Sequence, residues 1–158
     1  MIRPSLRLGN EALYAISEAV AQDEVPELLG TVQDLHDTLL DFRERHGAGR
    51  AIAAPQIGVP KRLIYMCIDK PIILFNPTLR FPEDEIMTVL DDCMSFPHLL
   101  VHLQRYKHCS VTYYDENWRL HTWALEGDLS ELIQHEYDHL DGILATMRAV
   151  DGRAFVEI

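Results

Sequence analysis

The sequence predicts an α+β fold, in which mixed or antiparallel strands surround one central helix. Three observations support this prediction. Two long segments, residues 26–46 and 128–141, carry apolar side chains at helical spacing, and the runs between them are short, strand-like and separated by turn residues. The second helical segment also carries a metal-binding motif. A length of 158 residues suits one domain, so we expect residues 1–158 to form a single domain.

The first helix is expected to run from Pro26 to about His46. Its apolar residues recur three or four positions apart, which places them on one face of a helix. Gly47 and Gly49 follow the last turn, where glycine commonly ends a helix. The apolar positions are Leu28, Leu29, Val32, Leu35, Leu39, Leu40 and Phe42.

Short runs rich in β-branched and aromatic residues follow and are expected to form strands. Their bounds are residues 62–68, 71–75, 86–90, 108–114 and 120–126. Turn-forming residues 115–119 separate the last two runs, which predicts a hairpin. A second helix is expected over residues 128–141, closed by Gly142.

Residues 134–142 read Gln-His-Glu-Tyr-Asp-His-Leu-Asp-Gly and contain the pattern H-E-x-x-H. In a helix, His135 and His139 lie one turn apart on the same face, where two imidazoles can bind one divalent metal ion. Glu136 lies beside the first of them and can accept a proton from a metal-bound water. This arrangement indicates a metal-dependent hydrolase. The alternative is a surface helix that carries two histidines by chance.

Hydrolytic metal sites usually have three protein ligands, so a third ligand is expected elsewhere in the chain. Cys93 is the strongest candidate because it lies among polar, turn-forming neighbours in residues 91–97. Cys67 and Cys109 lie in apolar or strand-like runs and are expected to be structural thiols. One thiolate and two imidazoles suit Fe(II), Zn(II), Ni(II) or Co(II).

A stretch rich in small residues, 47–62, precedes these two motifs. Small side chains allow the backbone to approach a ligand closely. Gln56 lies in this stretch and can donate a hydrogen bond to a developing oxyanion. The alternative is an ordinary loop that leads into a strand.

Taken together and in this order, the three segments resemble the peptide deformylase family. The family motifs are G-x-G-L-A-A-x-Q, E-G-C-L-S and Q-H-E-x-D-H, which correspond here to residues 49–56, 91–95 and 134–139. The third motif is intact, and the resemblance extends over about residues 5–148. It implies the fold of that family and the hydrolytic removal of an N-formyl group, with release of formate and a free amine.

The resemblance also implies a metal centre with three protein ligands, Cys93, His135 and His139. One divalent ion would bind there. We expect Fe(II) in the cell, with Zn(II), Ni(II) or Co(II) as alternatives, because the same donor set accepts all four.

By the same resemblance, Glu136 would be the general base and acid. Gln56 and the backbone N–H of Met94 would hold the developing oxyanion while a metal-bound water attacks the formyl carbonyl. Glu136 would then pass the proton to the leaving amine.

The second motif departs from the family pattern at two positions. Asp91 replaces a glutamate that family members pair with a downstream arginine, and Arg105 resembles that partner. The charge is retained, so we expect a structural Asp91–Arg105 ion pair. Asp92 replaces a glycine beside Cys93. Its charge either raises the pKa of a metal-bound water or attracts a cationic substrate, and the alternative is that the side chain points to solvent.

Departures at the substrate side-chain pocket predict a changed specificity. Arg50 occupies an apolar pocket position of the family, and Ala51 replaces the second glycine of the first motif. On the metal-binding helix, Asp128 and Glu131 replace apolar pocket residues, whereas Leu132 remains apolar. Charged walls disfavour a methionine side chain, because the charges would lose their solvation. The alternative is that Asp128 caps the helix as its N-cap residue and Glu131 completes a capping box.

Three functions therefore remain open. The protein is expected to act on N-formyl peptides, or else on another small N-formyl or N-acyl amine. A non-catalytic metal-binding relative is the third alternative, but retention of Glu136 and Gln56 argues against it, since a structural metal requires neither.

Composition restricts the partners. The net charge of −11 argues against direct binding to nucleic acid or an anionic membrane. No apolar run approaches the roughly 20 residues that span a bilayer, and the N-terminus lacks a signal-peptide core. Three cysteines, one assigned to metal, do not suggest a disulfide framework, so a cytoplasmic protein is expected. The sequence leaves the oligomeric state open.

Overall fold

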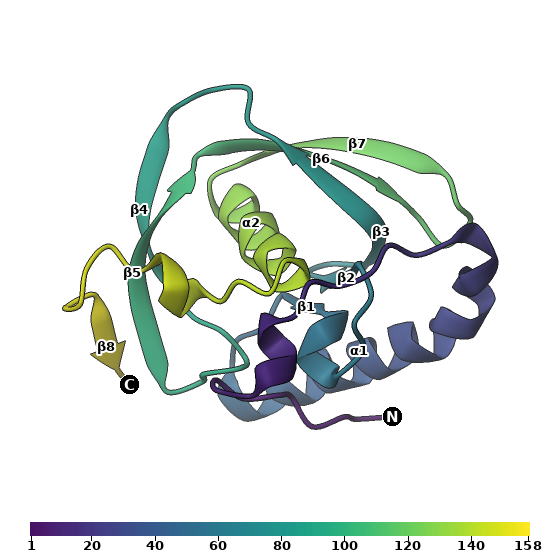
Figure 1. Ribbon diagram of the computed structural model, residues 1–158, viewed down its shortest axis with the longest axis horizontal. Coiled ribbons are helices and arrows are strands. Elements are labelled where there is room, and N and C mark those ends of the chain that lie inside the picture. The colour runs from purple at the N-terminus through teal and green to yellow at the C-terminus, as the bar shows by residue number, and fades with distance from the viewer.

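The computed structural model describes residues 1–158 and has two α-helices and eight strands (Figure 1). Helix α1 spans Val25–His46 and helix α2 spans Asp128–Leu140. The strands are β1 Ala51–Ala53, β2 Leu63–Cys67, β3 Pro71–Arg80, β4 Ile86–Asp91, β5 Leu99–Tyr106, β6 His108–Tyr114, β7 Leu120–Glu126 and β8 Phe155–Glu157. Short 3-10 helices span Glu11–Tyr14, Gln22–Glu24, Ala54–Ile57 and Ala145–Arg148. The prediction of an α+β fold is confirmed.

The strands form two antiparallel sheets, and α2 lies between them (Figure 1). The larger sheet has the order β1-β2-β3-β6-β7, and the smaller sheet has the order β4-β5-β8. Helix α2 contacts β1, β6 and β7 of the larger sheet and β5 of the smaller one. The predicted central position of the motif helix is therefore confirmed.

Helix α1 covers the β1–β2 end of the larger sheet. It has Pro26 in its first turn, where the missing N–H removes no intrahelical hydrogen bond. Leu35 and Leu39 of the predicted face are fully buried, whereas Leu29 is exposed and does not belong to that face. Gly47 ends the helix with φ 71°, and its N–H donates to the Arg43 carbonyl.

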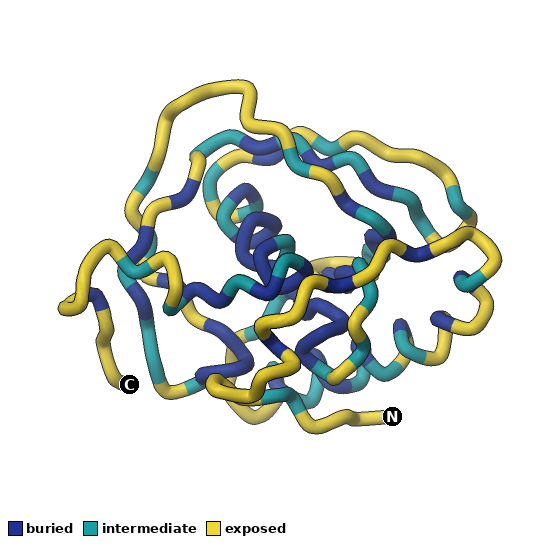
Figure 2. Tube along the Cα trace, in the orientation of Figure 1, coloured by how far each residue is buried: buried dark blue, intermediate teal, exposed yellow.

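Helix α2 is the more enclosed of the two helices, as its largely dark blue trace in Figure 2 shows. One face is apolar, and Ile133 and Leu140 on that face pack among side chains of the larger sheet. The opposite face carries the buried polar side chains of the candidate site. Beyond the helix, Gly142 has φ 72°, and a Cβ there would collide with the Tyr14 carbonyl.

Strands β1, β5 and β8 were not predicted from the sequence, and β3 extends beyond its predicted end at residue 75. In β5, Val101, Leu103 and Arg105 are buried and alternate with outward-facing side chains. A buried arginine interrupts the apolar period of two, which explains why this pattern was not recognised. Strand β3 continues because Asn76, with φ 49°, lies in a β-bulge rather than a turn, and its side chain bonds both backbone groups of Val20.

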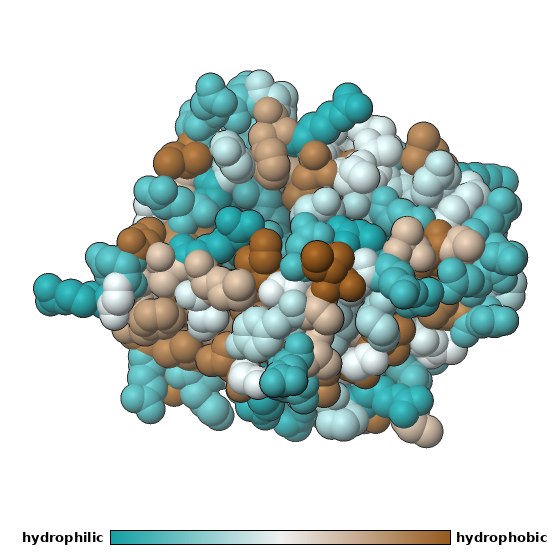
Figure 3. Space-filling model, viewed as in Figure 1, coloured by the Kyte–Doolittle hydropathy of each residue, from teal (hydrophilic) through white to brown (hydrophobic).

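The surface is mixed in character. Apolar side chains are scattered among hydrophilic ones on the face shown in Figure 3. Neither helix has both the length and the apolar character that a membrane-spanning helix requires. Cys67, Cys93 and Cys109 are all free thiols.

Candidate functional site

Three metal-ligating side chains meet between the two sheets. The ligand atoms of Cys93, His135 and His139 all lie within 4.8 Å of one another, and all three residues are buried. His135 and His139 are one turn apart on α2, and Cys93 follows β4 in a turn. The Cys93 Sγ lies 3.4 Å from the His139 Nε2. The structure therefore brings together the three residues that the sequence analysis assigned to metal.

The ring of His135 is oriented by a carboxylate. Its Nδ1 lies 2.8 Å from the Asp91 Oδ2, and an ionised carboxylate only accepts, so Nδ1 is the donor and Nε2 remains for a metal. Burial opposes the charged form of His135, but Asp91 and Cys93 outweigh it and raise the pKa well above its usual range. Burial likewise opposes ionisation of Asp91, but His135 and Arg105 keep the pKa of this carboxyl below its usual value.

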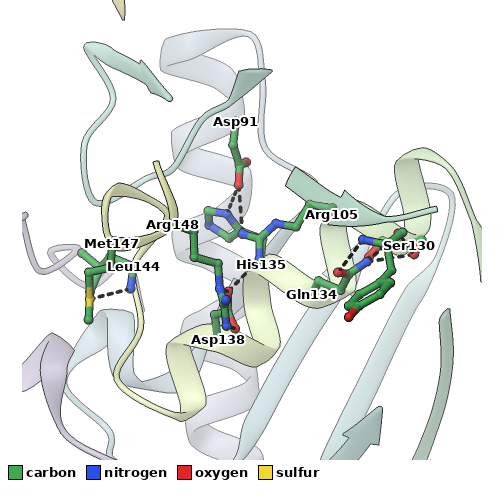
Figure 4. A network of polar contacts seen from close by, with 10 residues as sticks. Asp91, Arg105, Ser130, Gln134, His135, Asp138, Leu144, Met147 and Arg148 are labelled. Atoms are coloured by element: carbon green, nitrogen blue, oxygen red, sulfur yellow. Dashed lines mark hydrogen bonds and ion pairs between the residues drawn. The ribbon is translucent and has the colours of Figure 1, made fainter. Parts of the chain in front are cut away.

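The predicted Asp91–Arg105 pair is part of a longer buried network (Figure 4). The Arg105 Nη2 donates to the Asp91 Oδ2 at 3.2 Å, and its Nη1 donates to the Asp138 Oδ2 at 2.7 Å. Arg148 also donates to both oxygens of Asp138, at 2.6 and 2.9 Å. Sequence reasoning gave no role to Asp138 or Arg148. Asp138 could have been found, because it lies three residues after His135 on the same helix face.

Glu136 is buried beside this group of possible metal ligands, and its Oε1 has no hydrogen-bond partner. Burial raises the pKa of Glu136 to about 7. A carboxyl group with such a pKa can both accept and release a proton near neutral pH. This property suits a general base that later acts as an acid.

The donor set fits a catalytic metal site. Three protein ligands leave a coordination position open, and a thiolate with two imidazoles suits borderline-soft divalent ions. Burial, with the charge of His135, lowers the pKa of His139 well below its usual range. The His139 Nδ1 and the Glu136 Oε1 are buried without protein partners, which is consistent with a polar ligand between the side chains.

Gln56 is held rigidly beside Cys93. Its Oε1 accepts a hydrogen bond from the Ala53 N–H at 2.9 Å, which directs its Nε2 toward the Cys93 Sγ at 3.6 Å and the Ser95 Oγ at 3.3 Å. The backbone N–H of Met94 has no acceptor within the protein. Both predicted oxyanion donors therefore lie next to the Cys93 sulfur.

A cavity of about 340 Å³ opens onto this site. Gln56, Met94, His135 and Glu136 line its catalytic end. The predicted pocket residues Arg50, Ala51, Glu131 and Leu132 also line it.

Asp128 does not line this cavity, which corrects its assignment to the pocket. The reason is helix geometry. At about 1.5 Å of rise per residue, Asp128 lies about 10 Å from His135 along the axis, whereas Glu131 lies about 6 Å away.

The capping alternative is wrong. Gly127, with φ 62°, occupies the N-cap position of α2, and no side chain caps the helix. Glu131 is instead half-buried in the cavity, where its pKa is raised to about 7, chiefly by burial and also by Asp91, while Arg50 opposes the rise. Neither Arg50 nor Glu131 forms an ion pair within 4.0 Å. Asp92 also lines the cavity without an ion pair, so the cavity contains one unpaired arginine and two unpaired carboxyl groups.

Comparisons with known proteins agree with this geometry. Residues 2–154 match the family model described as polypeptide deformylase. Peptide deformylase 2 of Ralstonia nicotianae is 33% identical over 98% of this chain and 91% of its own length. The peptide deformylase of Treponema pallidum is 35% identical over 87% of this chain and 82% of its own.

Solved structures are similar as well. The crystal structure of a peptide deformylase from Legionella pneumophila superposes with a TM-score of 0.84 and 31% identity, covering 94% of this chain and 86% of that one. A peptide deformylase from Synechococcus elongatus, in complex with actinonin, gives a TM-score of 0.86 at 29% identity, covering 96% of this chain and 82% of that one.

Proposed function

The chain belongs to the polypeptide deformylase family, and from this we propose that it hydrolyses the N-formyl group of a peptide with the help of one divalent metal ion. The reaction adds water across the formyl C–N bond and releases formate and a free amine. The observation that carries the proposal is the convergence of Cys93, His135 and His139 beside the unpartnered carboxyl of Glu136.

Cys93, His135 and His139 would hold the metal, which when bound supplies a Lewis acid that polarises the carbonyl and acidifies water. Asp91 fixes the tautomer and orientation of His135 through the 2.8 Å contact at Nδ1. Arg105 in turn holds Asp91, so the ligand geometry depends on the buried network behind it.

Glu136 accepts a proton from the attacking water and delivers it to the nitrogen of the leaving amine. Its raised pKa, near 7, suits both transfers. Gln56 Nε2 and the Met94 N–H donate to the carbonyl oxygen as negative charge develops on it. Because Gln56 is held through its Oε1, its donor group is already oriented before substrate binds.

The side chain of the formylated residue would occupy the part of the cavity lined by Arg50, Ala51, Glu131 and Leu132. Burying a methionine side chain against Arg50 and Glu131 removes solvent from two unpaired charges, which is unfavourable. A polar or charged first residue is therefore preferred over methionine. The same two charges favour a second candidate function, the hydrolysis of a small charged N-formyl amine.

Fe(II) is the proposed metal in the cell, with Zn(II), Ni(II) and Co(II) as substitutes that the donor set also accepts. Three free thiols, one of them a metal ligand, support a reducing compartment such as the cytoplasm.

The deciding experiment measures formate release by the Fe(II)-loaded protein, handled without oxygen. The substrates are formyl dipeptide amides with Met, Leu, Lys, Arg, Asp or Glu first, and a set of charged N-formyl amino acids without a second residue. Release from the dipeptides supports a peptide substrate, release from the amino acids alone supports the small-amine alternative, and no release from any of them contradicts the proposed activity.

Metal binding is tested separately from activity. Cys93→Ala should lose the metal, measured by elemental analysis after gel filtration, whereas Cys109→Ala, which removes another buried thiol, should keep it. Full metal occupancy in Cys93→Ala would contradict the ligand assignment.

The specificity has its own test. The double variant Arg50→Ile, Glu131→Ile should gain activity on formyl-methionine peptides, and no gain would show that these charges do not set the specificity.

A further inference from the structure

The segment between helix α1 and strand β1, residues 47–50, forms one wall of the metal cavity. We refer to it as the wall segment. It has no regular secondary structure, and Gly49 has a φ of 136°, which favours glycine. A segment with two glycines among its four residues is flexible unless other groups restrain it. The shape of the cavity therefore depends on what restrains this segment.

Backbone hydrogen bonds restrain both ends of the wall segment. At its start, the Gly47 N–H donates to the Arg43 carbonyl at 2.8 Å. At its end, the Arg50 carbonyl accepts from the Cys67 N–H of β2 at 2.9 Å. Between these anchors, the backbone groups of residues 48–49 form no hydrogen bond with other backbone groups. A side chain supplies the missing restraint.

That side chain is Arg43, in the last turn of α1. Its Nε donates to the Gly49 carbonyl at 2.9 Å, and its Nη2 donates to the Cys67 carbonyl at the end of β2. The planar guanidinium presents its N–H groups in a fixed fork, which allows one side chain to join two carbonyls. Arg43 forms no ion pair, so its polar contacts are made with the backbone. It thus links the helix, the wall segment and the larger sheet.

The consequence for the cavity concerns Arg50, which lines it. The Gly49 carbonyl belongs to the peptide group before Arg50, and the Arg50 carbonyl belongs to the peptide group after it. Because Arg43 holds the first carbonyl and the Cys67 N–H holds the second, the φ and ψ angles of Arg50 are restricted. These angles set the direction in which its side chain leaves the backbone. The wall and its charged side chain are therefore preorganised before a substrate binds.

We propose that Arg43 is a positioning residue of the reaction, which keeps the wall segment in the conformation that binds the formylated residue, an inference that rests on the proposed function. Arg43 does not line the cavity, so it acts through the wall segment and contacts no reacting group. Without this restraint, binding would have to order the wall segment, which weakens substrate affinity. The chemical step should change little, because the metal ligands and Glu136 lie on other segments.

Steady-state kinetics test this with the metal-loaded enzyme and the formyl dipeptide amide that the wild type hydrolyses fastest. Arg43→Met keeps an aliphatic side chain but removes every donor. It should raise KM about 10-fold and leave kcat within about twofold, which is the pattern of lost ground-state binding. A wild-type KM in Arg43→Met, with or without a fall in kcat, would overturn the proposal.

Arg45→Met is the matched control. It removes another arginine from the same helical turn, one whose exposed side chain pairs with Asp41. Because Arg45 does not contact the wall segment, KM and kcat should both stay within about twofold of the wild type. A rise in KM equal to that of Arg43→Met would show that any loss of charge at the end of α1 has this effect, and would overturn the proposal.

The conservative variant separates the two hydrogen bonds from the charge. Arg43→Lys retains a cation at the C-terminal end of α1, where a cation is favourable, but one ammonium replaces the fork. Its KM should remain at least about threefold above that of the wild type, because an ammonium does not reproduce the planar contact with two carbonyls. Full recovery of KM would show that a charge is sufficient and would overturn the bridging role.

Amide hydrogen exchange separates the restraint by Arg43 from the proposed activity. In the metal-loaded protein without substrate, Arg43→Met should speed exchange of the Cys67 N–H by about 10-fold, because its acceptor lies in the loosened wall segment. Exchange within α2 should not change. If Cys67 exchange increases but the wild type releases no formate from any substrate, the proposed function fails and the restraint stands. If formate is released but Cys67 exchange is unchanged, the restraint fails and the function stands.

Discussion

The two faces of helix α2 are both buried but consist of opposite kinds of side chain. The face toward the larger sheet is apolar and includes Ile133 and Leu140, both completely buried. The face toward β4 and β5 carries His135, Asp138 and His139, which are buried to a similar degree. Equal burial therefore has opposite energetic consequences on the two sides.

Burial of the apolar face stabilises the fold, because each large aliphatic side chain contributes about 1.5–3 kcal/mol when removed from water. Burial of the polar face is unfavourable unless each group finds a partner. The Asp91–Arg105–Asp138–Arg148 network provides most of those partners, whereas Glu136 has none at its Oε1. Glu136, one of the groups left without a partner on this face, is the one to which we assign proton transfer, so stability and catalysis are separated across one helix.

The largest expected effect is on the polar face. Glu136→Gln should lower kcat by roughly 10²–10⁴-fold, because the amide cannot transfer a proton. Metal content and melting temperature should stay close to those of the wild type, since the side chain keeps its size and Glu136 forms no ion pair. Formate release measures kcat, elemental analysis measures the metal content, and thermal unfolding measures the melting temperature. Activity within tenfold of the wild type would exclude Glu136 as the general base.

The buried network should be the next most sensitive feature. Arg105→Met leaves Asp91 and Asp138 without this shared partner, and breaking a buried ion pair costs about 3–5 kcal/mol of unfolding free energy. Denaturant unfolding of the metal-loaded protein measures the loss.

Arg148→Met is the matched control for this substitution. The Arg148 side chain is 44% exposed, and Asp138 keeps its contact with Arg105 in that variant, so the loss should be much smaller. Equal losses in the two variants would show that Arg105 has no special role as the shared partner of both carboxylates.

The apolar face should respond in stability alone. Ile133→Ala opens a cavity against the larger sheet and should lower the unfolding free energy by about 2–4 kcal/mol. Below the unfolding transition, kcat per metal-loaded protein should remain within about twofold of the wild type, because Ile133 lies on the face opposite the ligands. A fall in kcat comparable to that of Glu136→Gln would show that the two faces are not separable.

Local patterns explain which parts of this organisation could be predicted. The β6–β7 hairpin agrees with its predicted bounds, because alternating side chains and the turn residues 115–119 are adjacent in sequence. The spacing of His135 and His139 and the apolar face of α2 are likewise local. Turn-forming neighbours made Cys93 the strongest candidate for the third ligand, and the resemblance of residues 91–95 to a family motif assigned it, since no spacing in the sequence connects Cys93 to His135, 42 residues later.

Features that depend on distant partners were missed. Arg105 looks like a strand-breaking charge until its contacts with Asp91 and Asp138 are known, so β5 was not predicted. Arg148 lies in a short 3-10 helix, with no sequence signal that links it to Asp138. Asp128 was assigned to the pocket because it aligns with an apolar position of the family motif. The alignment does not take into account that Asp128 lies two turns from His135 along the helix axis.

The smallest expected effect concerns Glu131, which lies one turn before His135 on the polar face of α2. Its folded-state pKa is raised from 4.5 to about 7, chiefly by burial, so the folded protein binds this proton more tightly than the unfolded chain does. The carboxyl therefore contributes stability below pH 4.5 that is lost as the pH rises through 7. Glu131→Gln does not titrate and should become more stable relative to the wild type as the pH increases from 5 to 8, by roughly 1 kcal/mol once solvent screening of a half-buried group is allowed for. Denaturant unfolding at both pH values, with metal in constant excess, measures this difference. If the difference in unfolding free energy between the variant and the wild type does not change with pH, Arg50 and the metal offset the effect of burial on Glu131. The carboxyl would then be as well stabilised as the partnered polar groups of this face.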